Sequence, residues 1–253
     1  MTRLNRLCSK GRLHVPHAHP ALPDHRPFIV GHRAGNHLPK VERAVRRGVD
    51  MLEADVWRYR SRLEVRHLKT LGPLPILWDR WVLAPGWTPR LHVRELLAAT
   101  PPEMPIMFDL KGEDPNLSPS IAESIRSGFP DRDIIMCTRF WIQLDRIRDM
   151  PDVYRIYSVG DVKERDAVFT RLESMEHPAV SIHRNLVTPA LMRRFDEVGA
   201  TVISWGATTR AEAELLISLG VDGLTVSEGP LQTWLLESRQ GINGTVSAQG
   251  KST

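Results

Sequence analysis

The segment Leu52-Glu53-Ala54-Asp55-Val56 alternates apolar and acidic side chains, which is the pattern of a β-strand with two unlike faces. Successive side chains of a strand point to opposite sides, so Leu52, Ala54 and Val56 share one face and the two carboxylates share the other. In a barrel the apolar face packs under helices, and the acidic face points into the interior near the carboxyl end of the strand. The segment therefore predicts a barrel strand that carries part of a polar site.

Eight predicted strands, each followed by a predicted helix, run along the chain. The strands are 28–32, 51–56, 106–111, 134–138, 154–159, 179–183, 201–205 and 223–227. The helices are 39–48, 92–99, 118–128, 140–149, 162–174, 188–198, 209–219 and 230–238. This alternation predicts an α/β protein, a (β/α)8 TIM barrel. The competing fold is an open doubly wound sheet, whose usual G-x-G-x-x-G turn is not matched by Gly31-His32-Arg33-Ala34-Gly35.

A long excursion, residues 57–105, separates the second and third barrel strands. It holds a short predicted strand at 63–67 and a segment rich in Trp and Pro, namely Trp78, Trp81, Trp87, Pro73, Pro75 and Pro85. Long excursions at the carboxyl end of a barrel strand are usually functional loops. This one could form an apolar lid or a seat for a lipid chain, or it could be a loop anchored on the barrel rim.

The two ends of the chain differ from the predicted barrel in composition. Residues 1–26 carry the net charge of +4, because five basic residues face Asp24 alone. We therefore expect a basic, flexible arm at 1–26, a single barrel domain at 27–238 and, from its Gly, Ser, Gln and Thr content, a disordered tail at 239–253. The arm could make peripheral contact with an anionic membrane, whereas the neutral remainder is not expected to bind nucleic acid.

The bulk composition, 42% hydrophobic and 25% charged, is typical of a globular domain with a full core. Cys8 and Cys137 are too few for a disulfide framework, and Cys137 is predicted to be a small buried hydrophobe. No secretory signal and no apolar run of about 18 residues is visible, so a cytoplasmic protein is predicted. The oligomeric state is not indicated.

The third barrel strand repeats the acidic pattern of the second. In Phe108-Asp109-Leu110-Lys111 the polar residues alternate with apolar ones, so Asp109 and Lys111 are predicted to point inward together. Inward carboxylates repel one another and are costly without a partner, and one divalent cation removes both problems. Three carboxylates without a nearby cysteine favour Mg²⁺ or Ca²⁺ over zinc. The alternative is a set of buried salt bridges, Glu53 with Lys111 and Asp55 with Arg33.

Two histidines and an arginine are predicted to face the same end of the barrel. His32 and Arg33 end the first strand, and His67 ends the short strand of the excursion. Cleavage of a phosphodiester needs a base, an acid and positive charge on the phosphoryl oxygens, and this set with a cation supplies all three. Most histidines are structural, and the neighbouring His37 is an alternative to His32.

In these motifs the chain resembles the glycerophosphodiester phosphodiesterases. Gly31-His32-Arg33, Glu53-x-Asp55 and His67 resemble the H-R … E-x-D … H signature of that family, and Asp109-Leu110-Lys111 resembles its acidic-x-Lys element. Trp205 with Leu219-Gly220-Val221-Asp222-Gly223 is similar to its late W-T-V-N … G-V-D-G segment. The resemblance covers about residues 28–230, with the motifs in the family's order.

The resemblance implies a TIM barrel of the phosphatidylinositol phospholipase C-like group, which hydrolyses a glycerophosphodiester to glycerol 3-phosphate and an alcohol. It implies one divalent cation, an acid–base pair of histidines and an arginine on the phosphate. The matching residues are Glu53, Asp55 and Asp109 for the cation, His32 and His67 for the pair, and Arg33 for the phosphate. Lys111, Trp205 and His183 are further predicted substrate contacts at strand ends, with Arg139 as a minor candidate, although Trp205 could equally belong to the core.

Several of the family's surrounding elements are replaced in this chain. Leu38-Pro39-Lys40-Val41-Glu42 stands in place of P-E-N-T, and Arg58-Tyr59-Arg60-Ser61-Arg62 in place of T-x-D-G. The usual H-D is His67-Leu68. Two alternatives therefore remain: headgroup cleavage of the lysophospholipase D or sphingomyelinase D-like type, with a cyclic product, and a barrel that binds phosphate without turnover.

Overall fold

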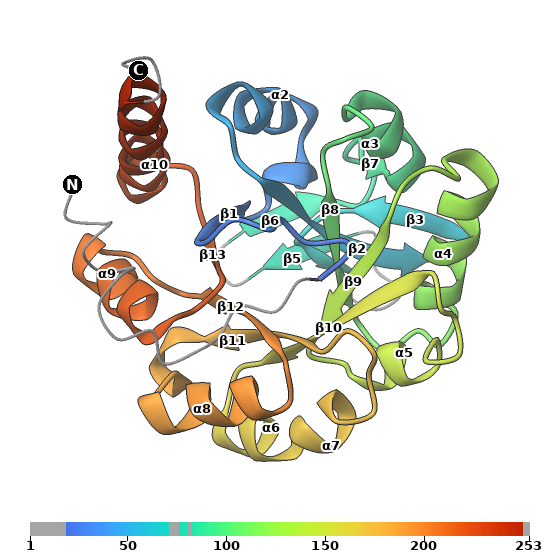
Figure 1. The fold of residues 1–253 in the computed structure, drawn as a ribbon. Coiled ribbons are helices and arrows are strands. Elements are labelled where there is room, and N and C mark those ends of the chain that lie inside the picture. The colour runs from blue at the N-terminus through green and yellow to red at the C-terminus, as the bar shows by residue number, and fades with distance from the viewer. Residues whose placement is uncertain (1–18, 71–75, 80–81, 250–253) are drawn as a thin grey trace.

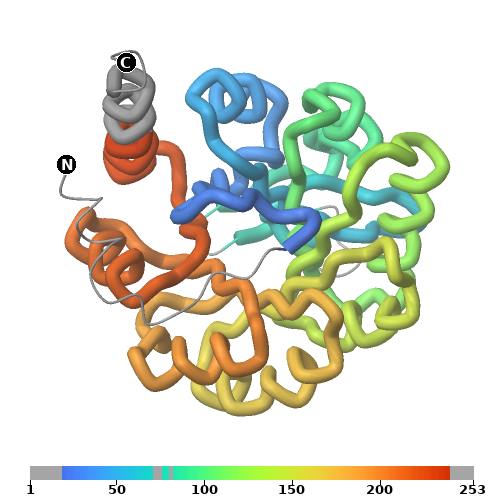
Figure 2. The backbone as a smooth tube through the Cα atoms, viewed as in Figure 1, coloured from blue at the N-terminus to red at the C-terminus, as the bar shows by residue number. Residues whose placement is uncertain are grey.

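The computed structural model describes residues 19–70, 76–79 and 82–249, and its eight parallel barrel strands are ordered as the sequence predicts (Figure 1). They are β1 (Phe28–Gly31), β2 (Met51–Tyr59), β8 (Ile106–Lys111), β9 (Ile134–Thr138), β10 (Val153–Val159), β11 (Ala179–His183), β12 (Thr201–Trp205) and β13 (Gly223–Val226). The barrel closes because β1 pairs in parallel with both β13 and β2, so the first and last barrel strands are neighbours (Figure 2). The TIM-barrel prediction is confirmed.

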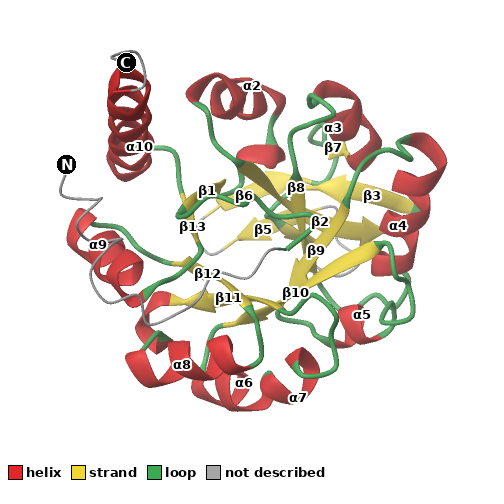
Figure 3. Cartoon of the chain, viewed as in Figure 1, coloured by secondary structure: helices red, strands yellow, loops and turns green. Residues whose placement is uncertain are grey.

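Helices surround the barrel on its outside (Figure 3). They are η1 (Ala34–Asn36), α2 (Leu38–Arg47), α3 (Val93–Ala99), α4 (Leu117–Gly128), α5 (Ile142–Asp145), α6 (Val162–Ala167), α7 (Phe169–Leu172), η2 (Arg184–Leu186), α8 (Pro189–Glu197), α9 (Arg210–Leu219) and α10 (Pro230–Gln249). Pro39 and Pro189 stand near the starts of α2 and α8, where a missing amide hydrogen costs nothing. None of the helices in the described part of the chain has the length and apolar character that crossing a membrane requires.

Three helices differ from their predicted bounds by more than one residue at an end. The helix predicted at 140–149 is only α5, because the amides of Ile147 and Met150 bond to carbonyls three residues earlier and continue as turns. The helix predicted at 162–174 is divided into α6 and α7. The last helix was predicted to end at 238, but α10 continues to Gln249 through residues predicted to form a disordered tail, and Arg239 on it donates to the Gly48 carbonyl at 2.8 Å. Residues 250–253 lie outside the described residues.

The barrel separates two apolar cores. Leu52, Ala54 and Val56 point outward into the larger core, where the strands pack against the helices. The inner core fills the amino-terminal part of the barrel and includes Met51 and Met107, each one alternation below an acidic residue of its strand. The interior is therefore apolar at its amino-terminal end and polar at its carboxyl end, which is where TIM barrels carry their sites.

The segment before β1 closes the amino-terminal end of the barrel. Ala21 and Leu22 are buried in the inner core with Phe28, and His19 is buried against Tyr154. Residues 19–26 were predicted to belong to a flexible arm. Instead, Ala21 and Leu22 in this segment pack into the open end of the barrel. Residues 1–18, the rest of the predicted arm, lie outside the described residues.

The excursion after β2 forms two small antiparallel additions. β3 (Arg62–Val65) pairs with the extension of β2, and β7 (Leu91–His92) pairs with β3. Between them, β4 (Lys69–Thr70), β5 (Ile76–Asp79) and β6 (Val82–Pro85) form a separate three-stranded sheet, which we call the insertion sheet. The predicted strand at 63–67 therefore ends two residues earlier. Trp81, Pro73 and Pro75 lie outside the described residues.

Candidate active site

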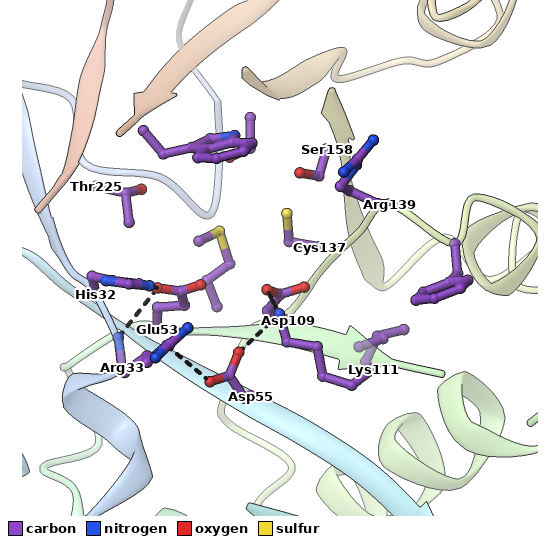
Figure 4. A pocket seen from close by; sticks show the side chains of 15 residues that line it. His32, Arg33, Glu53, Asp55, Asp109, Lys111, Cys137, Arg139, Ser158 and Thr225 are labelled. Carbon is purple, nitrogen blue, oxygen red and sulfur yellow. Dashed lines mark hydrogen bonds and ion pairs between the residues drawn. The ribbon is translucent and has the colours of Figure 1, made fainter. Parts of the chain in front are cut away.

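A pocket of about 270 Å³ opens at the carboxyl end of the barrel (Figure 4). It lies above the inner apolar core, and its lining comes from seven of the barrel strands and from the turns after β1 and β9. Seven predicted site residues line it: His32, Arg33, Glu53, Asp55, Asp109, Lys111 and Trp205. The pocket is therefore built largely from residues that strand alternation places on the inner face.

Three carboxylates meet at the base of this pocket because of the register between two strands. Asp55 on β2 is the direct partner of Asp109 on β8, and Glu53 precedes Asp55 by one alternation. One carboxylate oxygen from each of the three lies within 4.8 Å of the others. Glu53 and Asp55 are buried, and Asp109 is half-buried. This acidic triad could hold a metal ion.

The turn after β1 holds Asp55 in place through hydrogen bonds from η1. Gly35 in η1 lies so close to β2 that a Cβ at this position would come within 2.8 Å of the Ala54 Cβ. That approach brings the next residue, Asn36, against Asp55. The Asn36 amide donates to the Asp55 Oδ2 at 2.8 Å, and its carbonyl oxygen accepts from the Asp55 backbone N–H at 2.8 Å. Sequence reasoning missed Asn36, although the Gly35-Asn36 pair was a signal for a tight turn.

Two cations balance part of the acidic charge. Lys111 Nζ pairs with Asp109 and with Asp55, the latter at 2.9 Å, and Arg33 Nε lies 3.5 Å from Asp55. Arg33 is held by a left-handed backbone conformation with φ of 53°, which is rare for a long side chain, and its backbone N–H donates to Glu53 at 3.2 Å. Of the two salt bridges considered as an alternative to a cation site, only Asp55 with Arg33 is present.

Glu53 is the carboxylate that these cations leave without a close partner. Burial raises the pKa of Glu53 to about 8, and the charges of Asp109 and Asp55 act in the same direction. Burial would also raise the pKa of Asp55, but hydrogen bonds from His67, Lys111 and Asn36 together with the Lys111 charge hold it well below its ordinary value. The ionised form of Glu53 is unfavourable because two other carboxylates lie beside it, and an additional positive charge would stabilise that ionised form.

His32 stands at the edge of the pocket beside Glu53. Its Nδ1 is 2.8 Å from the Ser227 hydroxyl, and its Nε2 is 3.9 Å from Glu53 Oε2. Burial lowers the pKa of His32 to about 4, and the positive charge of Arg33 contributes to the shift. A neutral imidazole at this position can accept a proton.

His67 contacts the same group of residues but does not line the pocket. Its Nδ1 is 3.1 Å from Asp55 Oδ2, and because a carboxylate only accepts, this nitrogen is the donor. Its Nε2 lies 2.8 Å from Arg33 Nη2 and 3.2 Å from Asp79 Oδ2. Asp79 belongs to β5 of the insertion sheet, and no pattern in the sequence pointed to it.

His183 is placed away from the pocket lining. It packs edge-on against Trp205, with ring centroids 4.5 Å apart, and its Nδ1 accepts from the Asn185 backbone N–H. Trp205 lines the pocket, and its buried Nε1 has no hydrogen-bond partner among the described residues. His37, the alternative to His32, is exposed at the start of α2.

The remaining lining residues were not predicted, apart from Arg139, which was a minor candidate. They are Met107, Leu110, Cys137, Arg139, Phe140, Ser158, Ser181 and Thr225. The Thr225 hydroxyl is buried and has no partner among the described residues. Arg139 pairs with Asp161 and Glu164 outside the pocket. The three hydroxyl residues occupy inward positions of β10, β11 and β13, so alternation alone could have indicated them.

Comparison with known proteins gives matches only at the level of structure. No protein-family model matches the chain, and no curated protein matches it by sequence. A Silicibacter pomeroyi protein provisionally named a glycerophosphoryl diester phosphodiesterase superposes with a TM-score of 0.69 at 17% identity, covering 89% of this chain and 96% of its own. An Oleispira antarctica phosphodiesterase, solved with the product sn-glycerol-3-phosphate, gives a TM-score of 0.69 at 16% identity, covering 85% of this chain and 97% of its own.

A glycerophosphoryl diester phosphodiesterase from Parabacteroides distasonis gives a TM-score of 0.58 at 14% identity, covering 95% of this chain and 93% of its own. At identities this low, the superpositions establish the fold alone. The chain therefore shares, across most of its length, the TIM-barrel fold of structures named as glycerophosphodiester phosphodiesterases.

Proposed function

We propose that this protein hydrolyses glycerophosphodiesters to glycerol 3-phosphate and an alcohol with the help of one divalent cation. The observation that carries the proposal is the acidic triad of Glu53, Asp55 and Asp109 at the base of a pocket that His32, Arg33 and Lys111 also line. The Oleispira structure that shares the fold contains sn-glycerol-3-phosphate, the product named in the proposal.

The donor set of the triad fits a hard cation. All three donors are carboxylate oxygens, and Cys137, the lining thiol, is not one of the three. Oxygen-only ligation favours Mg²⁺ or Ca²⁺. Burial, with the charges of Asp109 and Asp55, raises the pKa of Glu53 because the site lacks positive charge beside this carboxylate. A bound cation would supply that charge. When bound, the cation would stabilise negative charge on a phosphoryl oxygen of the substrate.

The other charged residues divide the remaining tasks. Arg33 and Lys111, the two lining cations that pair with the triad, are assigned to the phosphate oxygens. His32 and His67 form the acid–base pair, His32 from the pocket edge and His67 through the Nε2 that faces Arg33. His67 Nδ1 donates to Asp55, which fixes the ring so that Nε2 is the nitrogen that can exchange a proton.

The inner wall of the pocket fits a small polyol. Ser158, Ser181 and Thr225 line it with hydroxyls, and Trp205 adds a flat apolar surface with a buried indole N–H that has no partner among the described residues. The hydroxyls of a glycerol group could pair with these donors and acceptors. We therefore assign this wall to the glycerol side of the substrate and the open mouth to the alcohol.

Release of glycerol 3-phosphate from glycerophosphocholine tests the proposal. We expect turnover with Mg²⁺ or Ca²⁺, no turnover in EDTA, and losses of about a hundredfold or more for His32→Ala and for His67→Ala, as for removal of an acid or base. His37→Ala is the matched control and is expected to keep full activity. Activity that survives both His32→Ala and His67→Ala would contradict the mechanism. Cation binding without turnover across a panel of phosphodiesters would instead support a barrel that only binds phosphate.

A second candidate is lipid headgroup cleavage in which a hydroxyl of the substrate attacks the phosphate and a cyclic product forms. The exposed tryptophans of the excursion favour it. Phosphorus NMR of the products of a lysophospholipid separates the two reactions, because a cyclic phosphodiester and a phosphomonoester have different shifts.

A further inference from the structure

The insertion sheet has two unlike faces. Leu77 and Asp79 on β5 share the face toward the barrel, since Leu77 is 2% exposed and Asp79 lies beside His67. Ile76 and Trp78 alternate with them and occupy the opposite face. Across the sheet Trp78 is paired with both Lys69 and Leu83, and Ile76 is paired with Pro85. The sheet therefore turns an apolar surface away from the protein.

This outward surface is exposed to an unusual degree. Leu83 is 70% exposed and Trp78 is 38% exposed, while Trp87 in the turn after β6 is 78% exposed. They are three of the nine large hydrophobic side chains that are exposed in the described part of the chain. Apolar residues gathered in this way mark a surface that contacts another apolar phase.

A basic groove borders the same sheet. Arg60, Arg62 and Arg90 line it together with Ile76 and Leu77 of β5. The only acidic residue in its lining is Glu64, which is buried and already paired with Arg66 and Arg90. Arg60 and Arg62 form no ion pair with any of the described residues, and Lys69 adds an exposed ammonium group on the apolar face itself.

We propose that the outward face of the insertion sheet docks on an anionic lipid bilayer. Tryptophan and leucine beside unpaired basic residues is the pattern of a surface that enters the headgroup region of a membrane, where the apolar groups are buried and the cations meet lipid phosphates. A second copy of this chain fits less well, because a twofold contact through this face would bring the like charges of the two basic grooves together.

The insertion sheet that carries the docking face also contacts the candidate active site, through Asp79 on its other face. Asp79, which contacts His67, is the immediate neighbour of Trp78 but points to the opposite side of the sheet. Phe140 lines the pocket and is 39% exposed, so the mouth has an apolar rim of its own. On the basis of the proposed function, we infer that the substrate is a phosphodiester headgroup presented at the bilayer surface.

Co-sedimentation with vesicles tests the docking face without reference to turnover. The vesicles are phosphatidylcholine alone and phosphatidylcholine with 30% phosphatidylglycerol. We expect wild-type protein to bind the anionic vesicles, to lose most binding in 0.5 M salt, and to bind pure phosphatidylcholine weakly. Binding should fall about tenfold or more in Leu83→Ser/Trp87→Ser and in Arg60→Ser/Arg62→Ser.

The matched control is Val162→Ser/Leu215→Ser, which removes exposed apolar side chains from α6 and α9 and should bind like wild type. Circular dichroism checks that every variant is folded. Failure of wild type to bind anionic vesicles would overturn the proposal, as would equal binding by the docking variants. Dimerisation that Leu83→Ser/Trp87→Ser abolishes, without any vesicle binding, would assign the face to a second copy instead.

Turnover keeps the two proposals apart. The docking variants should hydrolyse soluble glycerophosphocholine at the wild-type rate but lose activity on a lysophospholipid held in anionic vesicles. Vesicle binding by a protein that hydrolyses neither substrate would support the docking face and contradict the proposed function. Equal loss of activity on both substrates would show that the substitutions disturb the active site, and would overturn the role of the face in presenting the substrate.

Discussion

Replacing Asn36 with alanine removes the two hydrogen bonds that position Asp55. The Asn36 amide donates to a buried carboxylate, and such a charge-assisted bond contributes about 1.5–3 kcal/mol. The Asn36 carbonyl oxygen accepts from the Asp55 backbone N–H, and leaving that buried donor unpaired costs about 1–3 kcal/mol. We expect the free energy of unfolding to fall by about 2.5–6 kcal/mol, which is large for one residue outside the apolar core.

Urea unfolding at pH 7 in EDTA measures this loss. Asn116→Ala is the control, because Asn116 is exposed and its side chain makes no capping hydrogen bond; its cost should be below about 0.5 kcal/mol. The same experiment in an Asp55→Ala background isolates the side-chain bond. There the cost of Asn36→Ala should drop by about 1.5–3 kcal/mol, because only the backbone bond remains to be lost.

Cation affinity, measured by calorimetry, should weaken in Asn36→Ala because Asp55 then loses its fixed orientation. Loss of a residue that orients a ligand typically weakens binding about 10–100-fold. A loss of stability below about 1 kcal/mol, or an equal cost in both backgrounds, would refute the argument that Asn36 acts through Asp55.

Two further predictions concern charge. Lys111→Met should lower stability in EDTA by about 3 kcal/mol, because it leaves buried Asp55 and half-buried Asp109 without their lysine. Added Mg²⁺ should restore more stability to this variant than to wild type, as urea unfolding with and without the ion can show. Burial lowers the pKa of His19 from 6.5 to about 4, with His177 and Arg26 adding to the shift, so the neutral form is favoured by folding. The contribution of neutral His19 to the free energy of unfolding is fully present above pH 6.5 and is lost as the pH falls toward 4. The free energy of unfolding should drop by at most about 3 kcal/mol over that range. His19→Leu should remove this part of the pH dependence.

The barrel and its acidic triad could be predicted because both depend on strand alternation. Glu53, Asp55 and Asp109 were placed on inner faces from periodicity alone, and the pairing of consecutive barrel strands makes their two strands neighbours. The register that sets Asp55 directly beside Asp109 is seen only in the structure. The same logic would have indicated Ser181 and Thr225, which occupy inward positions of β11 and β13.

Contacts made by turns could not be predicted in this way. Asn36 reaches Asp55 only because η1 folds back onto β2 at Gly35, and Asp79 reaches His67 only because the insertion sheet returns to the barrel. No periodicity describes either path. The burial of His19, Ala21 and Leu22 was missed for a related reason: the charge and position of residues 1–26 suggested an arm, while Ala21 and Leu22 fill the open end of the barrel.

The charge balance of the pocket favours a ligand-binding role for the triad over a purely structural one. Three carboxylates share two close cations, and Glu53 is left with a backbone N–H and a histidine 3.9 Å away. Replacing buried charges of this kind with apolar residues often leaves stability unchanged or raises it, so the arrangement is a poor way to stabilise a barrel. A divalent cation held by these three carboxylates would add the positive charge that Glu53 lacks. Cation binding should therefore raise stability most in the protein that keeps all three carboxylates, and this gain should shrink in Glu53→Gln even though that change relieves the repulsion in the empty site.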